Sequence, residues 1–226
     1  MTQRAAPDRE GISELTTGRL SVYLRCLTFL ESISQRTVSS HELATRFHLS
    51  SAQIRKDLAC FGEFGTRGVG YDVSRLKENL IRTLGIDRTR NIVIIGAGNL
   101  GMALADYRGF NSGGFHIVAL FDVDPERFGR NTRSGVPVIS SSKLYDIVRA
   151  EGAEIGIIAV SAENAQKVYD DLADAGVCAV LNFAPIQIRL RHGVKVKSVD
   201  LRINLESLSY HLKNTEDGVA VEEDEA

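Results

Sequence analysis

Three glycines in the segment NIVIIGAGNLG have the clearest chemical use. The apolar residues 92–95 predict a buried strand, and Gly96, Gly98 and Gly101 follow it at the spacing of a dinucleotide-binding turn. In such a turn the first glycine permits a sharp bend, the second lets the backbone approach a pyrophosphate, and the third lets a helix pack closely on the strand. The amino end of that helix then faces the negative charge of the ligand.

A second apolar run, IVALFD, ends at Asp122, twenty-one residues after Gly101. A carboxylate there can accept hydrogen bonds from the adenosine ribose and would repel a 2′-phosphate, which favours NAD(H) over NADP(H). Arg127 and Arg130 keep NADP(H) open as an alternative. A Rossmann-like domain that binds coenzyme A is a further alternative.

NADH and NAD⁺ share their adenosine and pyrophosphate, so only the nicotinamide end of a site can distinguish them. The neutral reduced ring suits an apolar pocket, for which Phe183, Ala184 and Pro185 are the candidates. The dinucleotide contacts expected on these grounds are Gly96, Ala97, Gly98, Asn99, Leu100, Gly101, Asp122, Phe183 and Pro185.

The chain offers little for catalysis. A dehydrogenase needs a proton donor or acceptor beside the nicotinamide, but none of the six tyrosines has a lysine four residues later, and the five histidines are scattered. No metal-ligand spacing occurs, and no second catalytic domain is expected after the last strand. We therefore expect neither catalytic residues nor a metal, and the dinucleotide is interpreted as a signal.

The segments before the glycine-rich turn predict a winged helix-turn-helix. Apolar residues at helical spacing indicate a first helix that starts near residue 16. Capping-box patterns at Ser39 and Ser50 start two short helices, and the glycine-rich segment 62–71 indicates a hairpin after them.

The third of these helices, in SSAQIRKDLACF, has a core face formed by Ile54, Leu58 and Phe61. Its opposite face is small and basic, as a helix in the major groove of DNA requires. The expected DNA contacts are Ser51, Gln53, Arg55, Lys56 and, at the tip of the hairpin, Arg67. A docking or dimerisation module is the alternative.

After residue 90, apolar runs alternate with helical segments, which is typical of a parallel sheet covered by helices. The predicted fold class is α/β, with an N-terminal winged helix-turn-helix, a Rossmann-like NAD(H)-binding domain and a C-terminal helix. The expected organisation is a flexible leader (1–15), a winged-helix DNA-binding domain (16–85), a Rossmann domain (91–200), a C-terminal helix (201–213) and a disordered acidic tail (214–226).

The net charge of −2 hides an asymmetry. The tail carries six acidic residues and no basic one, so the rest of the chain is net positive, with the excess within residues 1–90. A positive N-terminal domain agrees with a DNA partner. No apolar stretch suits a membrane helix or a signal peptide, and three widely spaced cysteines suit reduced thiols. These features predict a cytoplasmic protein.

Taken together, these residues resemble the redox-sensing transcriptional repressors of the Rex family. The resemblance runs from LSVYLRCL to the last helix and is most specific in IRKDLACFGEFGTRGVGYDV, GAGNLGMALADYRGF, FDVDPE and VLNFAP. It implies a homodimer that binds palindromic operator DNA with NAD⁺ or without dinucleotide, and releases the DNA when NADH binds. It also implies that the last helix crosses to the partner subunit as a swapped dimerisation helix.

The resemblance further assigns a redox switch to three positions. Asp200 is expected to pair with Tyr107 in one redox state and with Arg25 in the other, and Tyr107 thereby joins the expected dinucleotide contacts. The chain departs from the family at Leu201, where some members have an aromatic residue. Cys60, on or near the DNA-facing side, opens a second route to redox sensing through thiol oxidation.

The prediction is thus a dimeric NADH-responsive repressor. One alternative is a small NAD-dependent oxidoreductase with an N-terminal docking domain, which turnover of NADH with an acceptor would support. Another is a DNA-binding regulator that senses coenzyme A, which the copurifying ligand would identify.

Overall fold

The computed structural model describes residues 13–62, 64–66, 68–111 and 113–216. The chain divides into two compact units, with the boundary between Asp87 and Arg88. No helix within the described ranges combines the length and the apolar character needed to span a bilayer. In the same ranges, no group of three or more His, Cys, Asp or Glu side chains is placed to hold a metal ion.

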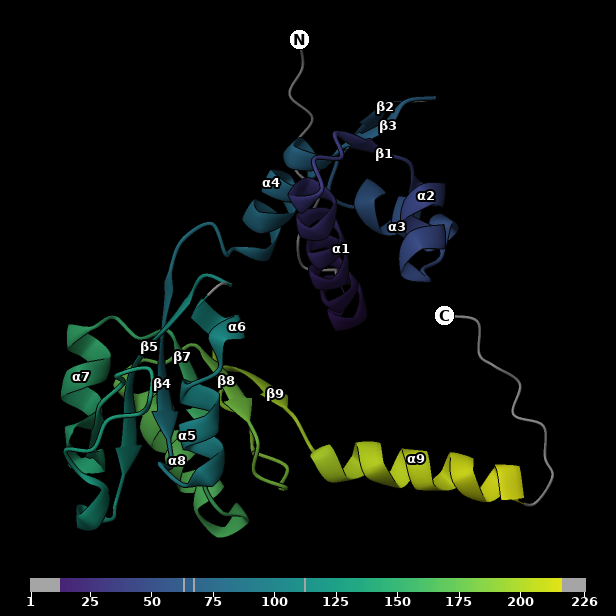
Figure 1. The fold of residues 1–226 in the computed structure, drawn as a ribbon. Coiled ribbons are helices and arrows are strands. Elements are labelled where there is room, and N and C mark those ends of the chain that lie inside the picture. Colours follow the sequence, from purple (N-terminus) through teal and green to yellow (C-terminus); the bar gives the residue numbers. More distant parts are fainter. Residues whose placement is uncertain (1–12, 63, 67, 112, 217–226) are drawn as a thin grey trace. The chain divides into compact units, whose positions relative to one another are not determined.

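The N-terminal unit is a winged helix-turn-helix, as predicted. Its elements are α1 (Glu14–Ser32), β1 (Thr37–Val38), α2 (Ser40–Phe47), α3 (Ser51–Ala59), β2 (Gly65–Thr66), β3 (Gly70–Asp72) and α4 (Val73–Leu84), labelled in Figure 1. The three strands form an antiparallel sheet in the order β1-β3-β2. Strands β2 and β3 make the wing that follows α3.

Local signals start and end the two short helices of this unit. Ser39 accepts a hydrogen bond from the Glu42 N–H (3.0 Å) at the start of α2, and Ser50 accepts one from the Gln53 N–H (3.3 Å) at the start of α3. Both predicted caps are confirmed. His48 ends α2 in the left-handed conformation (φ 54°), which turns the chain toward α3.

A single apolar cluster holds the N-terminal unit together. Its buried members come from all four helices and from β1, and they include Leu20, Leu27, Leu30, Val38, Leu43, Ile54, Leu58, Leu76 and Leu80. The predicted core face of α3 is confirmed for Ile54 and Leu58, whereas Phe61 lies only at the margin of the cluster. Helix α1 begins at Glu14, earlier than predicted, because Ser13 caps its first turn.

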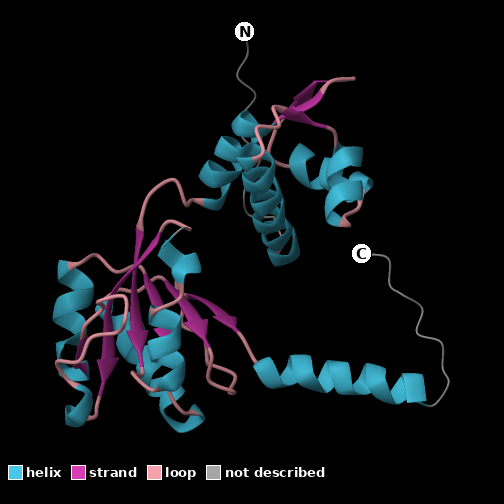
Figure 2. Ribbon diagram, in the orientation of Figure 1, coloured by secondary structure: helices cyan, strands magenta, loops and turns pink. Residues whose placement is uncertain are grey.

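The C-terminal unit is an α/β sandwich around a six-stranded parallel sheet (Figure 2). Its strands are β4 (Arg90–Ile95), β5 (Phe115–Asp122), β6 (Val138–Ser140), β7 (Ile155–Ile158), β8 (Ala179–Asn182) and β9 (Lys195–Ser198), and its helices are α5 (Asn99–Ala105), α6 (Arg108–Asn111), α7 (Leu144–Ala150), α8 (Ala162–Ala175) and α9 (Leu201–Glu216). The strand order is β6-β5-β4-β7-β8-β9. This is the order of a Rossmann sheet, whose ligands bind where the order reverses, beside the carboxyl end of β4.

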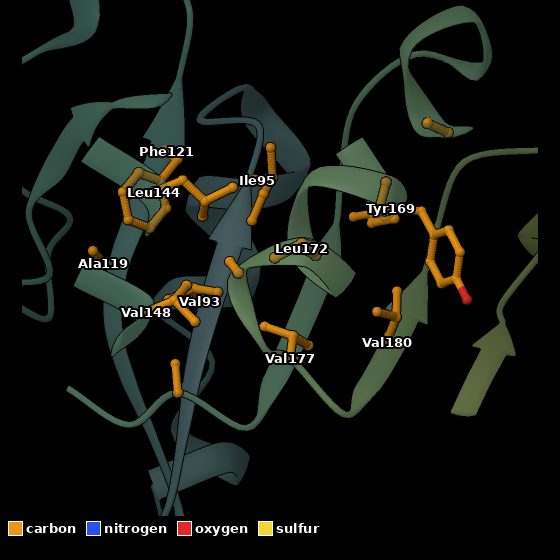
Figure 3. Close-up of a cluster of buried hydrophobic side chains, with 14 of the residues drawn as sticks. Val93, Ile95, Ala119, Phe121, Leu144, Val148, Tyr169, Leu172, Val177 and Val180 are labelled. Atoms are coloured by element: carbon orange, nitrogen blue, oxygen red, sulfur yellow. The ribbon is translucent and has the colours of Figure 1, made fainter. Parts of the chain in front are cut away.

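Each face of the sheet has its own apolar layer. On one face, side chains of α7 and α8 pack on β4, β5 and β8, and Phe121, Leu144, Tyr169 and Leu172 are among those labelled in Figure 3. On the other face, Ala105 and partly buried residues of α5 and α6 pack on a second set of strand residues. Two packed layers fix the strand ends that carry the glycine-rich turn.

The sequence prediction differs from the structure between β5 and β7. Strand β6 and helix α7 were not predicted, and the segment after Asp124 forms a single 3₁₀ turn, Pro125–Arg127, which Asp124 caps. Helix α5 ends at Ala105. The chain leaves the helix there because the Asp106 carboxylate accepts hydrogen bonds from the Ser134 N–H (2.8 Å) and hydroxyl (3.0 Å).

Candidate dinucleotide and DNA sites

The glycine-rich turn joins β4 to α5 in a conformation that requires two of its three glycines. Gly96 has φ +103°, and a Cβ atom there would collide with the carbonyl oxygen of Ala159. A Cβ atom at Gly101 would collide with the carbonyl oxygen of Gly96. These are the bend and the close packing expected of the first and third glycines.

Gly98 differs from its neighbours because the protein itself leaves room for a side chain. The nearest atom to a Cβ there would be Nη1 of Arg127, at 3.6 Å, which is an ordinary contact. The packing of the fold therefore does not require a glycine at position 98. Asn99 and Leu100 follow it as exposed residues at the amino end of α5.

Asp122, at the end of β5, holds the turn in place. Its Oδ2 accepts a hydrogen bond from the Ala97 N–H (2.7 Å), and its Oδ1 accepts one from the Asp124 N–H (3.0 Å). Burial alone would raise the pKa of this carboxyl, but the backbone donors and the nearby Arg127 outweigh burial, so its pKa is lowered. Asp122 is thus an ionised acceptor at the edge of the turn, where its contact with a ribose stays a prediction.

Arg127 adds a guanidinium to the same edge. Its Nη1 lies 3.2 Å from Asp122 Oδ2, and its Nε lies 3.2 Å from Asp124 Oδ2. Two carboxylates therefore share one guanidinium beside Gly98, and the cluster keeps a net negative charge.

A cleft of about 460 Å³ opens at the carboxyl ends of β4, β5 and β6. It is lined by parts of the turn, by the ends of these strands and by side chains of α7 and α8, including Gly96, Asp122, Val123, Ser140, Tyr145 and Asn164. The strand ends are visible in Figure 1, where β4 leads into α5. Gly96 and Asp122 thus border one cavity, whereas the expected contacts Gly98, Phe183 and Pro185 do not line it.

The loop after β8 carries the two residues expected at the nicotinamide end. Phe183 is half-buried against the α5 side of the sheet, and Pro185 is exposed. Asn182, which pattern analysis did not single out, is fully buried and shapes this loop. Its side-chain oxygen accepts from the Ala184 N–H (2.9 Å), and its amide nitrogen donates to the Ala184 carbonyl (3.1 Å) and to Ser198 Oγ in β9 (3.3 Å). A polar residue that ends an apolar strand three residues before a proline was the available signal.

The three expected switch residues lie in both units. Arg25 is an exposed residue of α1 in the N-terminal unit, while Tyr107 and Asp200 belong to the C-terminal unit. Tyr107 is 58% exposed and packs edge-on against Phe110, with 5.1 Å between ring centroids. Asp200 Oδ1 accepts from the Arg202 N–H (2.9 Å) and so caps α9. The predicted alternation of Asp200 between partners stays a prediction.

The exposed face of α3 carries the expected DNA contacts. Arg55 and Lys56 are exposed and Ser51 is half-exposed, and Arg55 donates from Nη1 to the Ser40 hydroxyl at the start of α2 (3.0 Å). A groove of about 510 Å³ separates this face from the wing, and Arg55 lines it. Arg67, the expected contact at the tip of the wing, lies outside the described residues.

Behind this face lies a buried ionic group that the sequence did not reveal. Asp57 is 2% exposed and accepts a bidentate pair from Arg19 of α1, from Nε (2.6 Å) and Nη2 (2.8 Å). The Tyr23 hydroxyl (2.9 Å) and the Gln53 side-chain amide (2.7 Å) complete its acceptor sites. Burial alone would raise the pKa of Asp57, but these donors outweigh burial and lower it. The network fastens α3 to α1.

Gln53, one of the expected DNA contacts, also takes part in this network. It is half-buried, and its amide nitrogen is engaged by Asp57 within the domain. Cys60, in contrast, is exposed at the end of α3, and Cys26 is buried in α1.

Comparisons with known proteins match both units. Residues 11–59 match a family model described as "Putative DNA-binding protein N-terminus", and residues 87–186 match one described as "CoA binding domain". A redox-sensing transcriptional repressor Rex from Streptomyces avermitilis is 47% identical over 93% of this chain and 83% of its own length. One from Carboxydothermus hydrogenoformans is 48% identical over 89% of this chain and 97% of its own length.

Solved structures agree with these relatives. The crystal structure of RSP in complex with NAD⁺ and operator DNA has a TM-score of 0.86 and 38% identity, and covers 91% of this chain and 94% of that one. The structure of RSP in complex with NADH has a TM-score of 0.80 and 37% identity, and covers 92% and 96%. The fold, the strand order and these relatives lead to one conclusion: the chain belongs to the Rex family of redox-sensing transcriptional repressors.

Proposed function

We propose that this protein is a transcriptional repressor that binds palindromic operator DNA, senses the NADH/NAD⁺ ratio and releases the DNA when NADH binds. One observation carries the proposal: a single chain joins a helix-turn-helix with an exposed basic α3 to a glycine-rich turn at the reversal point of a Rossmann sheet. The Rex relatives, and the RSP complexes with NAD⁺ plus operator DNA and with NADH, support it.

The dinucleotide acts as an allosteric ligand in this proposal. Its pyrophosphate would lie beside Gly98, where the protein leaves room, and its ribose would face Asp122. The nicotinamide would face Phe183 and Pro185, and there the reduced and oxidised rings differ in charge. A tenfold preference between the two forms corresponds to only about 1.4 kcal/mol, which one or two contacts in an apolar pocket can supply.

The proposed repressor is a homodimer joined by α9. Leu201, Leu205, Leu208 and Leu212 recur at helical spacing along this helix, and each is between 60% and 66% exposed. Such a stripe is more apolar than a solvated helix needs, and a partner subunit would bury it. A helix that crosses to the partner supports the redox signal by connecting the two subunits.

The proposed switch uses the spare oxygen of Asp200. Its Oδ1 caps α9, while its Oδ2 accepts no hydrogen bond from any residue the structure describes. We propose that Oδ2 pairs with the Tyr107 hydroxyl in one state and with Arg25 in the other. When Asp200 exchanges the neutral Tyr107 for the cationic Arg25, the dinucleotide site would be coupled to the DNA-binding domain.

No chemical turnover of the dinucleotide is proposed, and incubation with NADH and carbonyl acceptors should leave NADH absorbance unchanged. A repressor works where its DNA and its NAD(H) pool are, so the proposed function places the protein in the cytoplasm.

The test is the binding of a labelled palindromic duplex, selected from a random pool, during separate titrations with NADH and NAD⁺. We expect NADH to release the DNA at a far lower concentration than NAD⁺. If the duplex stays bound in the presence of both dinucleotides but is released by coenzyme A, then coenzyme A rather than NADH is the signal. If no duplex is selected, the N-terminal unit is a docking module and the proposal is wrong.

A further inference from the structure

The side-chain amide of Gln53 in α3 has a fixed orientation that bears on base recognition, and this inference rests on the proposed DNA binding. Gln53 is the third residue of α3 and lies between its core and its exposed face. In helix-turn-helix proteins, residues in the first turns of the second helix contact base edges in the major groove. Gln53 thus occupies a position that reaches DNA, while its inner side contacts the domain.

The inner partner of Gln53 is a carboxylate that can only accept hydrogen bonds. Asp57 Oδ1 accepts from Gln53 Nε2 (2.7 Å) and from Arg19 Nη2 (2.8 Å), and Oδ2 accepts from Arg19 Nε (2.6 Å) and from the Tyr23 hydroxyl (2.9 Å). An ionised carboxylate offers no donor. The opposite orientation of the Gln53 amide would place its carbonyl oxygen against a carboxylate oxygen, so the chemistry of Asp57 fixes the nitrogen inward.

The carbonyl oxygen of Gln53 is consequently the outward end. It forms no hydrogen bond with any residue in the described ranges. In those same ranges, no buried side-chain nitrogen or oxygen lacks a partner. An oxygen without a partner that is not buried is open to solvent, so Oε1 is available to a molecule that approaches the exposed face of α3.

We propose that Gln53 is a specificity-determining residue that presents Oε1 to the major groove and selects an amino base, adenine or cytosine, at one position of each half-site. Adenine N6 and cytosine N4 are donors in the major groove, whereas guanine O6 and thymine O4 are acceptors at the equivalent edge. Asp57 acts on this choice through Gln53 and is a positioning residue. Without such a partner, the amide group of a glutamine could rotate by half a turn and present either its oxygen or its nitrogen, so it could pair with either class of base.

The experiment compares half-sites selected from a random duplex pool by the full-length wild-type protein and by Gln53→Met, which keeps the length of the side chain but has no amide. For the wild type we expect one position at which adenine or cytosine is preferred. Replacement by guanine or thymine there should weaken binding at least fivefold. With Gln53→Met this ratio should fall to about one, while the preferences at other positions persist.

Tyr23→Phe is the matched control, because it removes another hydrogen bond to Asp57 without touching Gln53. It should keep the wild-type preference. A further measurement changes the DNA and keeps the wild-type protein, so no mutation can affect folding. The selected adenine is replaced by unsubstituted purine, or the selected cytosine by a base without the 4-amino group. Either replacement should also weaken binding at least fivefold.

Three outcomes would overturn the inference. The first is a Gln53→Met protein that retains every base preference, the second is a preference for guanine or thymine at the position it affects, and the third is a wild-type protein indifferent to loss of the base amino group. A wild-type protein that binds NADH but selects no duplex contradicts the proposed function itself, and the inference falls with it.

Discussion

At the scale of single residues, two carboxylates show how a buried acid can organise the structure around it. Asp57 collects donors from two helices, and Asp122 collects backbone donors from the glycine-rich turn and its own loop. In both, hydrogen bonds to the ionised form outweigh the cost of burial, so both have a lowered pKa. The charge of each is therefore part of the native structure.

The Asp57 network predicts a specific dependence of stability on pH. The ordinary pKa of this carboxyl is 3.8, and the folded value is lower. Its contribution to stability is thus fully present above pH 3.8, begins to decline below that pH, and is lost as the pH falls through the folded pKa. Asp57→Asn removes the charge that faces Arg19, whose side chain is 35% exposed, and weakens the hydrogen bonds from Tyr23 and Gln53. We expect it to destabilise the protein by about 1–3 kcal/mol at pH 7.

Denaturant unfolding from pH 7 to pH 2.5 checks this expectation. The difference in unfolding free energy between wild type and Asp57→Asn should shrink in the acid range, because protonation removes the same charge from the wild type. Other carboxylates are common to both proteins and cancel in the difference. A difference that stays constant down to pH 2.5 would contradict the assignment.

Asp124 has a distinct role, because it shares Arg127 with Asp122. Asp124→Asn should leave the turn intact, since an asparagine can still cap Glu126, but it reduces the negative charge that repels a 2′-phosphate and partly frees Arg127. We expect NADPH affinity to rise about tenfold, or about 1.4 kcal/mol, with NADH affinity within about twofold of the wild type. Titration calorimetry with both ligands measures this.

Glu126→Gln is the control for that experiment. It removes the same charge from the same 3₁₀ turn, but its side chain forms no hydrogen bond or ion pair with the part of the chain that the structure describes. If both variants gain NADPH affinity equally, long-range charge rather than the release of Arg127 is responsible.

At the scale of elements, the turn between β4 and α5 separates two glycines that the fold requires from one, Gly98, that the fold does not require. Gly101→Ala would push a methyl group into the Gly96 carbonyl oxygen and should destabilise the protein by about 1–3 kcal/mol or more. Gly98→Ala meets only Arg127, at 3.6 Å, and should leave stability within about 0.5 kcal/mol of the wild type. Its methyl group would occupy the space of the pyrophosphate and lower NADH affinity at least tenfold.

Thermal unfolding and NADH titration of the two variants provide the comparison. Tight NADH binding by a stable Gly98→Ala protein would mean that the dinucleotide does not lie against this turn. Loss of stability in Gly98→Ala would instead show that the glycine serves packing that the static structure does not reveal.

The same elements show which features a sequence can reveal. The glycine-rich turn and the caps at Ser39 and Ser50 depend on residues a few positions apart, so their spacing predicted them. Helix α7 was missed because its first residue follows Lys143, which makes no capping hydrogen bond. Strand β6 was missed because it has only three residues at the edge of the sheet.

The missed site residues have a different cause. Asp57 occupies an ordinary helix position next to a lysine, and nothing local distinguishes it from a solvated charge. Its burial depends on Arg19 and Tyr23, which are 38 and 34 residues away. Asn182 similarly depends on Ser198 in the neighbouring strand, which only the tertiary structure brings close.

At the scale of the whole molecule, the proposed dimer depends on the apolar stripe of α9. Leu208 is 60% exposed, and burial of one leucine contributes about 1.5–3 kcal/mol. Because two-fold symmetry counts each side chain twice, Leu208→Glu should weaken dimerisation by roughly 10²–10⁴-fold. Sedimentation equilibrium measures the effect.

Ser207→Glu is the control, because it adds the same charge beside the stripe and should leave the dimer intact. If both variants weaken dimerisation equally, the effect is due to charge alone.

The dimer would also carry the redox signal, which Asp200→Asn tests directly. The amide oxygen of asparagine can still cap α9 in place of Oδ1, so the helix should persist, but the side chain no longer offers a charge to Arg25. We expect operator DNA still to bind and NADH affinity to stay within about twofold, whereas at least tenfold more NADH is needed to release the DNA, a loss of about 1.4 kcal/mol of coupling.

Glu206→Gln, which breaks the Arg202 ion pair on the same helix, should respond like the wild type. If Asp200→Asn releases DNA at the wild-type NADH concentration, Asp200 is only a helix cap and the switch lies elsewhere. Because coupling is reciprocal, the same variant should also show less weakening of NADH binding by operator DNA, which separates a lost switch from a lost site.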